Sequence, residues 1–221
     1  MNYTLLINTM LFRGTSEEEA RSMLGCLGSY ERQYGKGDTI YRAGENVVSM
    51  GMVLSGSVNI EIGDLWGNKT ILGHMEAGQL FAETYACIPG EPLMVNVTAC
   101  EKSEVLFLNA ARLMETCSNS CAHHNRLIQN LLQISAQKNL ALSRRILHTS
   151  PKTIRGRLLS YLSEQAKQSG SYQFTIPFNR QQLADYLGVD RSAMSNELSK
   201  LQAEGVLSFH KNRFTLNSVT G

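Results

Sequence analysis

The sequence predicts an α+β protein with an N-terminal antiparallel β-barrel or jelly roll, a long helix and a C-terminal winged helix-turn-helix. Eleven of the 18 glycines lie between Gly28 and Gly90, a distribution typical of short strands joined by tight turns. From Leu93 to Ser150 the chain contains neither Gly nor Pro, so a long helix can form there. Residues 179–201 then show two short helical patterns separated by a glycine, which indicates a helix-turn-helix.

Charge divides the chain in the same way. Residues 1–118 carry 8 Lys or Arg against 14 Asp or Glu, and residues 119–221 carry 13 against 5. An acidic front joined to a basic back favours two domains, of which the second binds a polyanion. We therefore expect a barrel domain at residues 1–117, a connecting helix at 118–149 and a winged domain at 150–221.

The N-terminal domain should begin with a helix and continue as short strands. Ser16 and Glu19 have the spacing of a capping box, which predicts a helix that ends near Cys26 or Leu27. Alternating apolar and polar residues between glycine-containing turns predict a small antiparallel barrel or jelly roll. Its expected strands are Thr39–Tyr41, Ser49–Leu54, Val58–Ile62, Lys69–Met75, Val95–Ala99 and Glu104–Leu108.

The long helix is expected from about Ser118 to His148 and would measure ~45 Å. A domain of ~120 residues has a radius of gyration of only ~14 Å, so the helix should extend beyond it. We expect one apolar face to cover the barrel and another to pair with a second copy, which makes the protein a homodimer. A helix buried wholly within its own chain is the alternative. The apolar residues, spaced mostly by three and four, are Leu127, Ile128, Leu131, Leu132, Ile134, Leu140, Leu142, Ile146 and Leu147.

The C-terminal region should begin after Pro151, because the residue before a proline disfavours helical dihedral angles. A helix near Thr153–Lys167 and an extended segment at Gln173–Pro177 come first. Lys152, Arg155 and Arg157 are candidate surface cations of this region.

The helix-turn-helix follows from capping signals. Asn179 can cap a helix over Arg180–Leu187, and Gly188 can adopt the left-handed conformation of a tight turn. Asp190 can cap a second helix over Arg191–Ala203. After Gly205, the segments Val206–Phe209 and Arg213–Leu216 can pair as a basic hairpin, the wing.

This order of elements resembles the Crp/Fnr superfamily of bacterial transcription regulators over nearly the whole chain. The most specific similarities are Arg180–Leu201 and the cassette-like segment Gly78–Glu83. The resemblance implies that the barrel senses a small-molecule effector and that the long helix forms a homodimer. It also implies that the two winged domains read two half-sites of double-stranded DNA, with RNA polymerase as a candidate protein partner.

The effector predicted from this resemblance is not cyclic AMP. Members that bind cyclic AMP use a cassette glutamate for the ribose, and Gln79 stands at that position. The chain has no Lys or Arg between Lys69 and Lys102, so no cation is available there for a buried phosphate. A cyclic-nucleotide-responsive regulator that uses backbone amides is the alternative. The expected effector pocket contains Gly78, Gln79, Leu80, Phe81, Glu83, Leu93 and Met94.

A second constellation could hold a metal ion or an iron–sulfur cluster. If helical, Cys117, Cys121 and His124 share one face, and thiolate and imidazole are suitable ligands. The alternatives are a redox-active thiol and plain core packing, since free cysteines are commonly buried and inert. No cofactor can be assigned from the sequence.

The residues expected to contact DNA lie mostly on the second helix of the motif. The family's usual readers there are Glu and Arg four residues apart, whereas this chain has Ser192 and Asn196. The candidate base-reading residues at the N-terminal edge of that helix are Arg191, Ser192, Ser195 and Asn196. The candidate phosphate contacts, which position the protein without specifying sequence, are Arg180, Gln181, Ser199, Lys200 and Lys211.

Other classes of protein are disfavoured. The barrel has one histidine, His74, and the chain has no nucleophile-elbow or phosphate-binding-loop motif, so we do not expect an enzyme. No apolar run approaches the roughly 18 residues of a membrane span, and Met1–Phe12 lacks the basic start of a signal peptide. Five scattered cysteines are typical of a reducing compartment, and we expect a cytoplasmic protein.

Overall fold

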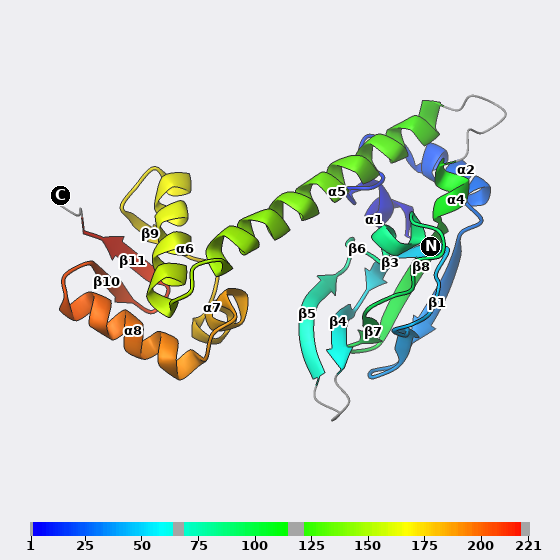
Figure 1. Cartoon of the computed structure of the whole chain (residues 1–221). Coiled ribbons are helices and arrows are strands. Elements are labelled where there is room, and N and C mark those ends of the chain that lie inside the picture. The colour runs from blue at the N-terminus through cyan, green and yellow to red at the C-terminus, as the bar shows by residue number, and fades with distance from the viewer. Residues whose placement is uncertain (1, 64–68, 115–121, 218–221) are drawn as a thin grey trace. The chain divides into compact units, whose positions relative to one another are not determined.

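The computed structural model describes residues 2–63, 69–114 and 122–217 (Figure 1). The chain forms two compact units, residues 1–136 and residues 137–221. The long helix α5, Ala122–Thr149, contributes its first half to the first unit and its last turns to the second. No helix in these ranges is long and apolar enough to cross a membrane.

The first unit is a jelly roll of two four-stranded sheets and not a closed barrel. One sheet has the order β1-β8-β3-β6 and the other the order β2-β7-β4-β5, with antiparallel pairs throughout. The strands are β1 Tyr30–Tyr34, β2 Thr39–Tyr41, β3 Ser49–Ser55, β4 Ser57–Gly63, β5 Lys69–Glu76, β6 Leu80–Phe81, β7 Asn96–Ala99 and β8 Ser103–Asn109. The helices are α1 Tyr3–Ile7, α2 Glu17–Cys26, α3 Glu83–Ala86 and α4 Ala110–Met114.

The six predicted strands and the first predicted helix are confirmed, and Ser16 and Glu19 form the capping box. The sequence did not reveal β1 and β6. Four of the five residues of β1 are exposed, so it lacks an apolar alternation, and β6 has only two residues.

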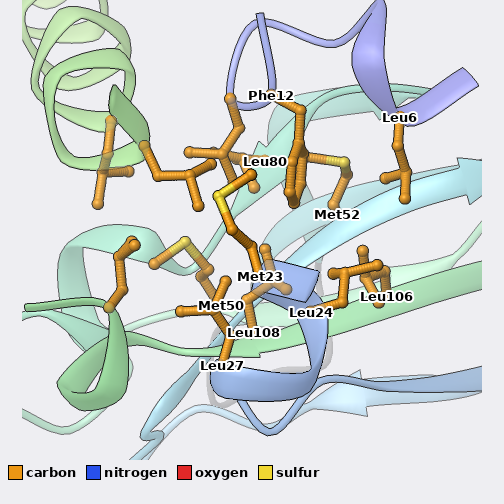
Figure 2. Close-up of a cluster of buried hydrophobic side chains, with 14 of the residues drawn as sticks. Leu6, Phe12, Met23, Leu24, Leu27, Met50, Met52, Leu80, Leu106 and Leu108 are labelled. Carbon is orange, nitrogen blue, oxygen red and sulfur yellow. The ribbon is translucent and has the colours of Figure 1, made fainter. Parts of the chain in front are cut away.

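Two hydrophobic clusters stabilise the first unit. One joins the N-terminal helices to β3 and β8, and Figure 2 shows Phe12, Met23, Met52, Leu80 and Leu108 converging in it. Leu127, Leu131 and Ile134 of α5 belong to the same cluster. The other cluster fills the space between the sheets with Tyr34, Val53, Val58, Phe81, Val97, Ala99, Val105 and Phe107.

The apolar residues of α5 therefore divide between two environments. Leu127, Leu131 and Ile134 are buried in the first unit, as expected for the face that covers the jelly roll. The remaining apolar residues are exposed on this chain: Ile128, Leu132, Leu140, Leu142, Ile146 and Leu147.

The second unit is a winged helix-turn-helix preceded by the last turns of α5 (Figure 1). Its helices are α6 Ile154–Ser169, α7 Arg180–Leu187 and α8 Arg191–Ala203. Its strands β9 Gln173–Thr175, β10 Leu207–His210 and β11 Arg213–Leu216 form an antiparallel sheet with the order β10-β11-β9. Leu183, Leu187, Met194, Leu198 and Leu201 are fully buried where the helices meet.

Candidate nucleic-acid interface and sensor site

The turn between α7 and α8 has the predicted chemistry. The side chain of Asn179 accepts a hydrogen bond from the Gln182 amide and caps α7. Gly188 ends that helix with φ +63°, a conformation that costs glycine little. Asp190 then caps α8 by accepting from the Ala193 amide. The sequence signals place both helices at the residues predicted.

One face of α8 is exposed on the described part of the chain. Arg191, Ser192 and Asn196 are exposed on its first two turns. Ser195 is half-buried, and its hydroxyl donates to the Arg191 carbonyl oxygen at 2.9 Å. Three of the four expected base readers therefore lie together and exposed on the described part of the chain. The fourth, Ser195, uses its hydroxyl proton in a hydrogen bond within α8.

The wing lies beside this helix in the second unit (Figure 1). Lys211 is exposed at its tip and has φ +54°, a left-handed conformation that a non-glycine residue adopts at a cost of about 1–2 kcal/mol. The Asn212 side chain donates to the Ile176 carbonyl oxygen and holds the tip to the strand region before α7. The strained residue is one of the predicted phosphate contacts.

Arg180 is less accessible than the other predicted phosphate contacts. Its guanidinium carbon lies 4.6 Å from the ring centre of Phe209 and 5.3 Å from that of Phe214. Burial lowers the pKa of Arg180 from its usual value, yet a guanidinium stays protonated at neutral pH. Gln181, Ser199 and Lys200 are exposed.

Two cations that the sequence placed on the surface are engaged within the domain. Arg155 pairs with Glu204 at 2.6 Å and with Glu197 at 3.8 Å, which joins α6 to α8. Arg157 donates to the carbonyl oxygens of Leu187 and Gly188 at 3.0 and 3.1 Å. Neither is free for DNA in this structure, whereas Lys152 is exposed.

Sequence reasoning missed a polar junction between α5 and the helix-turn-helix. Arg145 donates to the carbonyl oxygens of Asp185 and Tyr186, each at 3.1 Å. His148 is buried and hydrogen-bonded to Tyr186 and Glu164. No short-range pattern signals this junction, because its members lie up to 41 residues apart.

The predicted effector-pocket residues do not share one environment in the first unit. Leu80, Phe81, Glu83 and Leu93 are buried, whereas Gln79 is exposed and Met94 is 67% exposed. The Gln79 side chain accepts from the Glu76 amide at 2.8 Å and closes the turn at Gly78.

The ring of Phe81 occupies the space between the sheets. Its outer atoms lie so close to Gly51 that a Cβ there would stand 2.1 Å from the ring. Tyr41 packs edge-on to both Phe81 and Phe107. A hollow of about 340 Å³ in this unit has none of the predicted pocket residues in its lining, which consists of Tyr30, Tyr41, Glu45, Asn46, Val47, Val48 and Ser49.

The predicted metal site falls largely outside the described residues. Cys117 and Cys121 lie in the segment 115–121, and only His124 can be placed. His124 is 5% exposed, and its Nδ1 atom has no hydrogen-bond partner among the residues that the structure describes. A buried imidazole nitrogen without a partner is costly, because its desolvation is not compensated.

A jelly roll, a long helix and a winged helix-turn-helix with an exposed recognition helix are the architecture of a DNA-binding regulator. Residues 31–120 match the cyclic nucleotide-binding domain family, and residues 156–221 match the Crp-like helix-turn-helix domain family. The chain belongs to the Crp/Fnr superfamily of bacterial transcription regulators.

Individual relatives agree with this assignment. The CRP-like protein Clp of Xanthomonas campestris pv. campestris (strain B100) is 28% identical over 193 residues, which cover 81% of this chain and 80% of the relative. The catabolite activator protein of Thermus thermophilus has a similar fold, with a TM-score of 0.53 and 22% identity over 95% of this chain and 94% of that one. The c-di-GMP-responsive regulator CLP of Xanthomonas campestris gives 0.58 and 20% identity, covering 92% and 100%.

Proposed function

We propose that this regulator binds DNA as a homodimer, reads two half-sites with α8, and responds to a signal other than cyclic AMP or cyclic GMP. The observation that carries the proposal is the exposed N-terminal face of α8, on which Arg191, Ser192 and Asn196 stand clear of the domain core. In a helix-turn-helix this edge enters the major groove.

The chemistry of these side chains sets the expected sequence preference. A guanidinium can contact guanine O6 and N7 together, and an amide can contact adenine N6 and N7 together. Neither Ser192 nor Asn196 offers a carboxylate to cytosine N4. The half-site should therefore differ from that of relatives with Glu and Arg at these two positions.

Dimerisation is supported by the exposed face of α5. Ile128, Leu132, Ser135, Asn139, Leu142 and Ile146 follow one another at spacings of four and three, which is the heptad seam of a coiled coil. Its four apolar members range from 37% to 69% exposed on the single chain. A second copy of the same helix would remove them from water, with Asn139 facing its own counterpart.

The interior of the jelly roll disfavours a cyclic nucleotide as the signal. Phe81 fills the space against Gly51, and the stretch from Thr70 to Glu101 contains no Lys or Arg. A cyclic nucleotide placed there would displace a buried ring, and this stretch supplies no cation for its phosphate. The Clp relative is described as c-di-GMP-responsive, so that dinucleotide is the third compound to test.

A metal or redox role for the segment around His124 is the second candidate. The buried Nδ1 atom of His124, which lacks a hydrogen-bond partner among the described residues, favours it. Cys117 and Cys121 precede it in the sequence at ligand spacing. Ligand exchange or thiol oxidation in this part of the sequence would then be the signal.

Two measurements test the proposal. Gel shifts with genomic fragments should retain specific DNA in complexes of two chains per duplex, and complexes of one chain would contradict the dimer. Calorimetry should show no micromolar binding of cyclic AMP or cyclic GMP, and such binding would overturn the assignment of the signal. Micromolar binding of c-di-GMP would identify the effector instead.

A further inference from the structure

The carbonyl end of α7 receives hydrogen bonds from two different helices. Arg157 of α6 binds the Leu187 and Gly188 carbonyl oxygens, and Arg145 of α5 binds those of Asp185 and Tyr186. The last carbonyl groups of a helix are only partly paired within it and carry negative partial charge, so they favour a cation. Both arginines stabilise this end, and of the two it is Arg145 that belongs to α5 and connects α5 to it.

His148, one turn further along α5, makes a second connection. It is 3% exposed. Its Nδ1 atom lies 2.8 Å from the Tyr186 hydroxyl, and its Nε2 atom is hydrogen-bonded to the Glu164 carboxylate. Its ring packs edge-on against Tyr161 at 5.3 Å between centres. Burial raises the pKa of Tyr161 and of Tyr186, so both phenols are protonated at neutral pH. The last turn of α5 is thus attached to both α6 and α7.

The exposed seam of α5 lies on the same turns as this junction. Ile146 directly follows Arg145, and one residue corresponds to about 100° of rotation around a helix. One side of these turns is therefore free for a partner while the other side holds α7. No flexible loop intervenes between the seam and the contacts that hold the helix-turn-helix.

We infer that Arg145 and His148 are positioning residues that fix α7 and α8 to the dimer helix and thereby set the separation of the two half-sites. This inference rests on the proposed homodimer. Half-sites read by two recognition helices lie about one helical turn of DNA apart, and each inserted base pair rotates one half-site by roughly 35°. A rigid junction penalises such an insertion, whereas a loosened junction tolerates it.

The experiment uses the full chain and synthetic duplexes that carry the consensus selected by the wild-type protein. One duplex has two half-sites at the selected spacing, a second has one extra central base pair, and a third has one half-site. For Arg145→Ala and His148→Gln we expect about tenfold weaker binding to the first duplex, because the effective concentration of the second half-site falls. The affinities of these variants for the first and second duplexes should differ less than those of the wild type do. Their affinity for the half-site duplex should stay within about twofold of wild type.

Two matched variants separate positioning from other effects. Arg144→Ala removes the same charge from the neighbouring position, where Arg144 pairs with Glu164 of α6 at 3.5 Å rather than with the carbonyl groups of α7. It should retain the wild-type spacing preference. Arg157→Ala removes the other cap of α7 and should weaken binding to half-site and full-site duplexes alike while it retains that preference. Circular dichroism checks that each variant is folded. If His148→Gln does not fold, the spacing preference of Arg145→Ala alone tests the inference.

The inference is overturned if Arg145→Ala keeps the wild-type spacing preference or loses half-site affinity as Arg157→Ala does. If the wild-type protein binds one half-site as tightly as two, the proposed homodimer is overturned as well. Failure of the homodimer is thus seen in the wild type, whereas failure of the positioning inference alone is seen only in the variants.

Discussion

Gly51→Ala should strongly destabilise the first unit because of the packing between its sheets. The backbone of Gly51 does not itself require glycine, since its φ is not in the left-handed region. The new methyl group would lie 2.1 Å from the tip of the Phe81 ring, whereas carbon atoms pack at about 3.5–4.0 Å. The ring would have to retreat by roughly 1.5 Å, yet Phe81 is fully buried. Overpacking of a filled core costs about 1–3 kcal/mol, and we expect the upper end of that range.

Hydrogen exchange followed by mass spectrometry measures this loss in the first unit alone. A loss of about 3 kcal/mol corresponds to roughly 100-fold faster exchange of the slowest amides of β3. Phe81→Leu removes the ring atoms nearest Gly51, so the double variant Gly51→Ala with Phe81→Leu should be more stable than additivity predicts, by about 1–2 kcal/mol.

Gly25→Ala is the matched control, because a Cβ at Gly25 of α2 meets nothing within 4 Å. It should cost no stability and can add up to about 1 kcal/mol through helix propensity. Gly51→Ala as stable as wild type, or strict additivity in the double variant, would show that Phe81 does not fill the space between the sheets.

Three further predictions concern the seam, the metal site and the phosphate contacts. Leu142→Glu should produce monomers in analytical ultracentrifugation, whereas Asn139→Leu should tighten self-association and permit species larger than dimers. Either monomers from Asn139→Leu or dimers from Leu142→Glu would contradict the seam. If Cys121 is a metal ligand, Cys121→Ser should lower the metal content of anaerobically purified protein; equal, negligible metal in both proteins would favour core packing. Lys200→Ala should weaken binding to all DNA sequences alike and reduce the slope of log K against log salt concentration by about one. Weaker binding to the specific site alone would instead indicate that Lys200 reads a base.

The helix-turn-helix could be predicted to the residue because its signals are local. Asn179 and Asp190 cap helices through amides three residues away, and Gly188 supplies the left-handed turn between them. Such short-range hydrogen bonds are encoded by residue type and spacing alone. The same reasoning located the capping box at Ser16.

Features that depend on distant residues could not be predicted. Arg157 reads as a surface cation in the sequence, yet it binds carbonyl groups about 30 residues away. Phe81 lies in the cassette-like segment, and no local pattern signals its packing on Gly51 of the adjacent strand. Tertiary packing decides both outcomes, and neither partner carries a local signal for the other.

A randomised-operator selection with the wild-type protein, Arg191→Ala and Asn196→Ala tests the central claim most directly. The wild type should select two half-sites, and each variant should lose preference at its own base position at a cost of about 1–3 kcal/mol on the wild-type site. An identical consensus from all three proteins would contradict the assignment of these residues as the readers of DNA sequence.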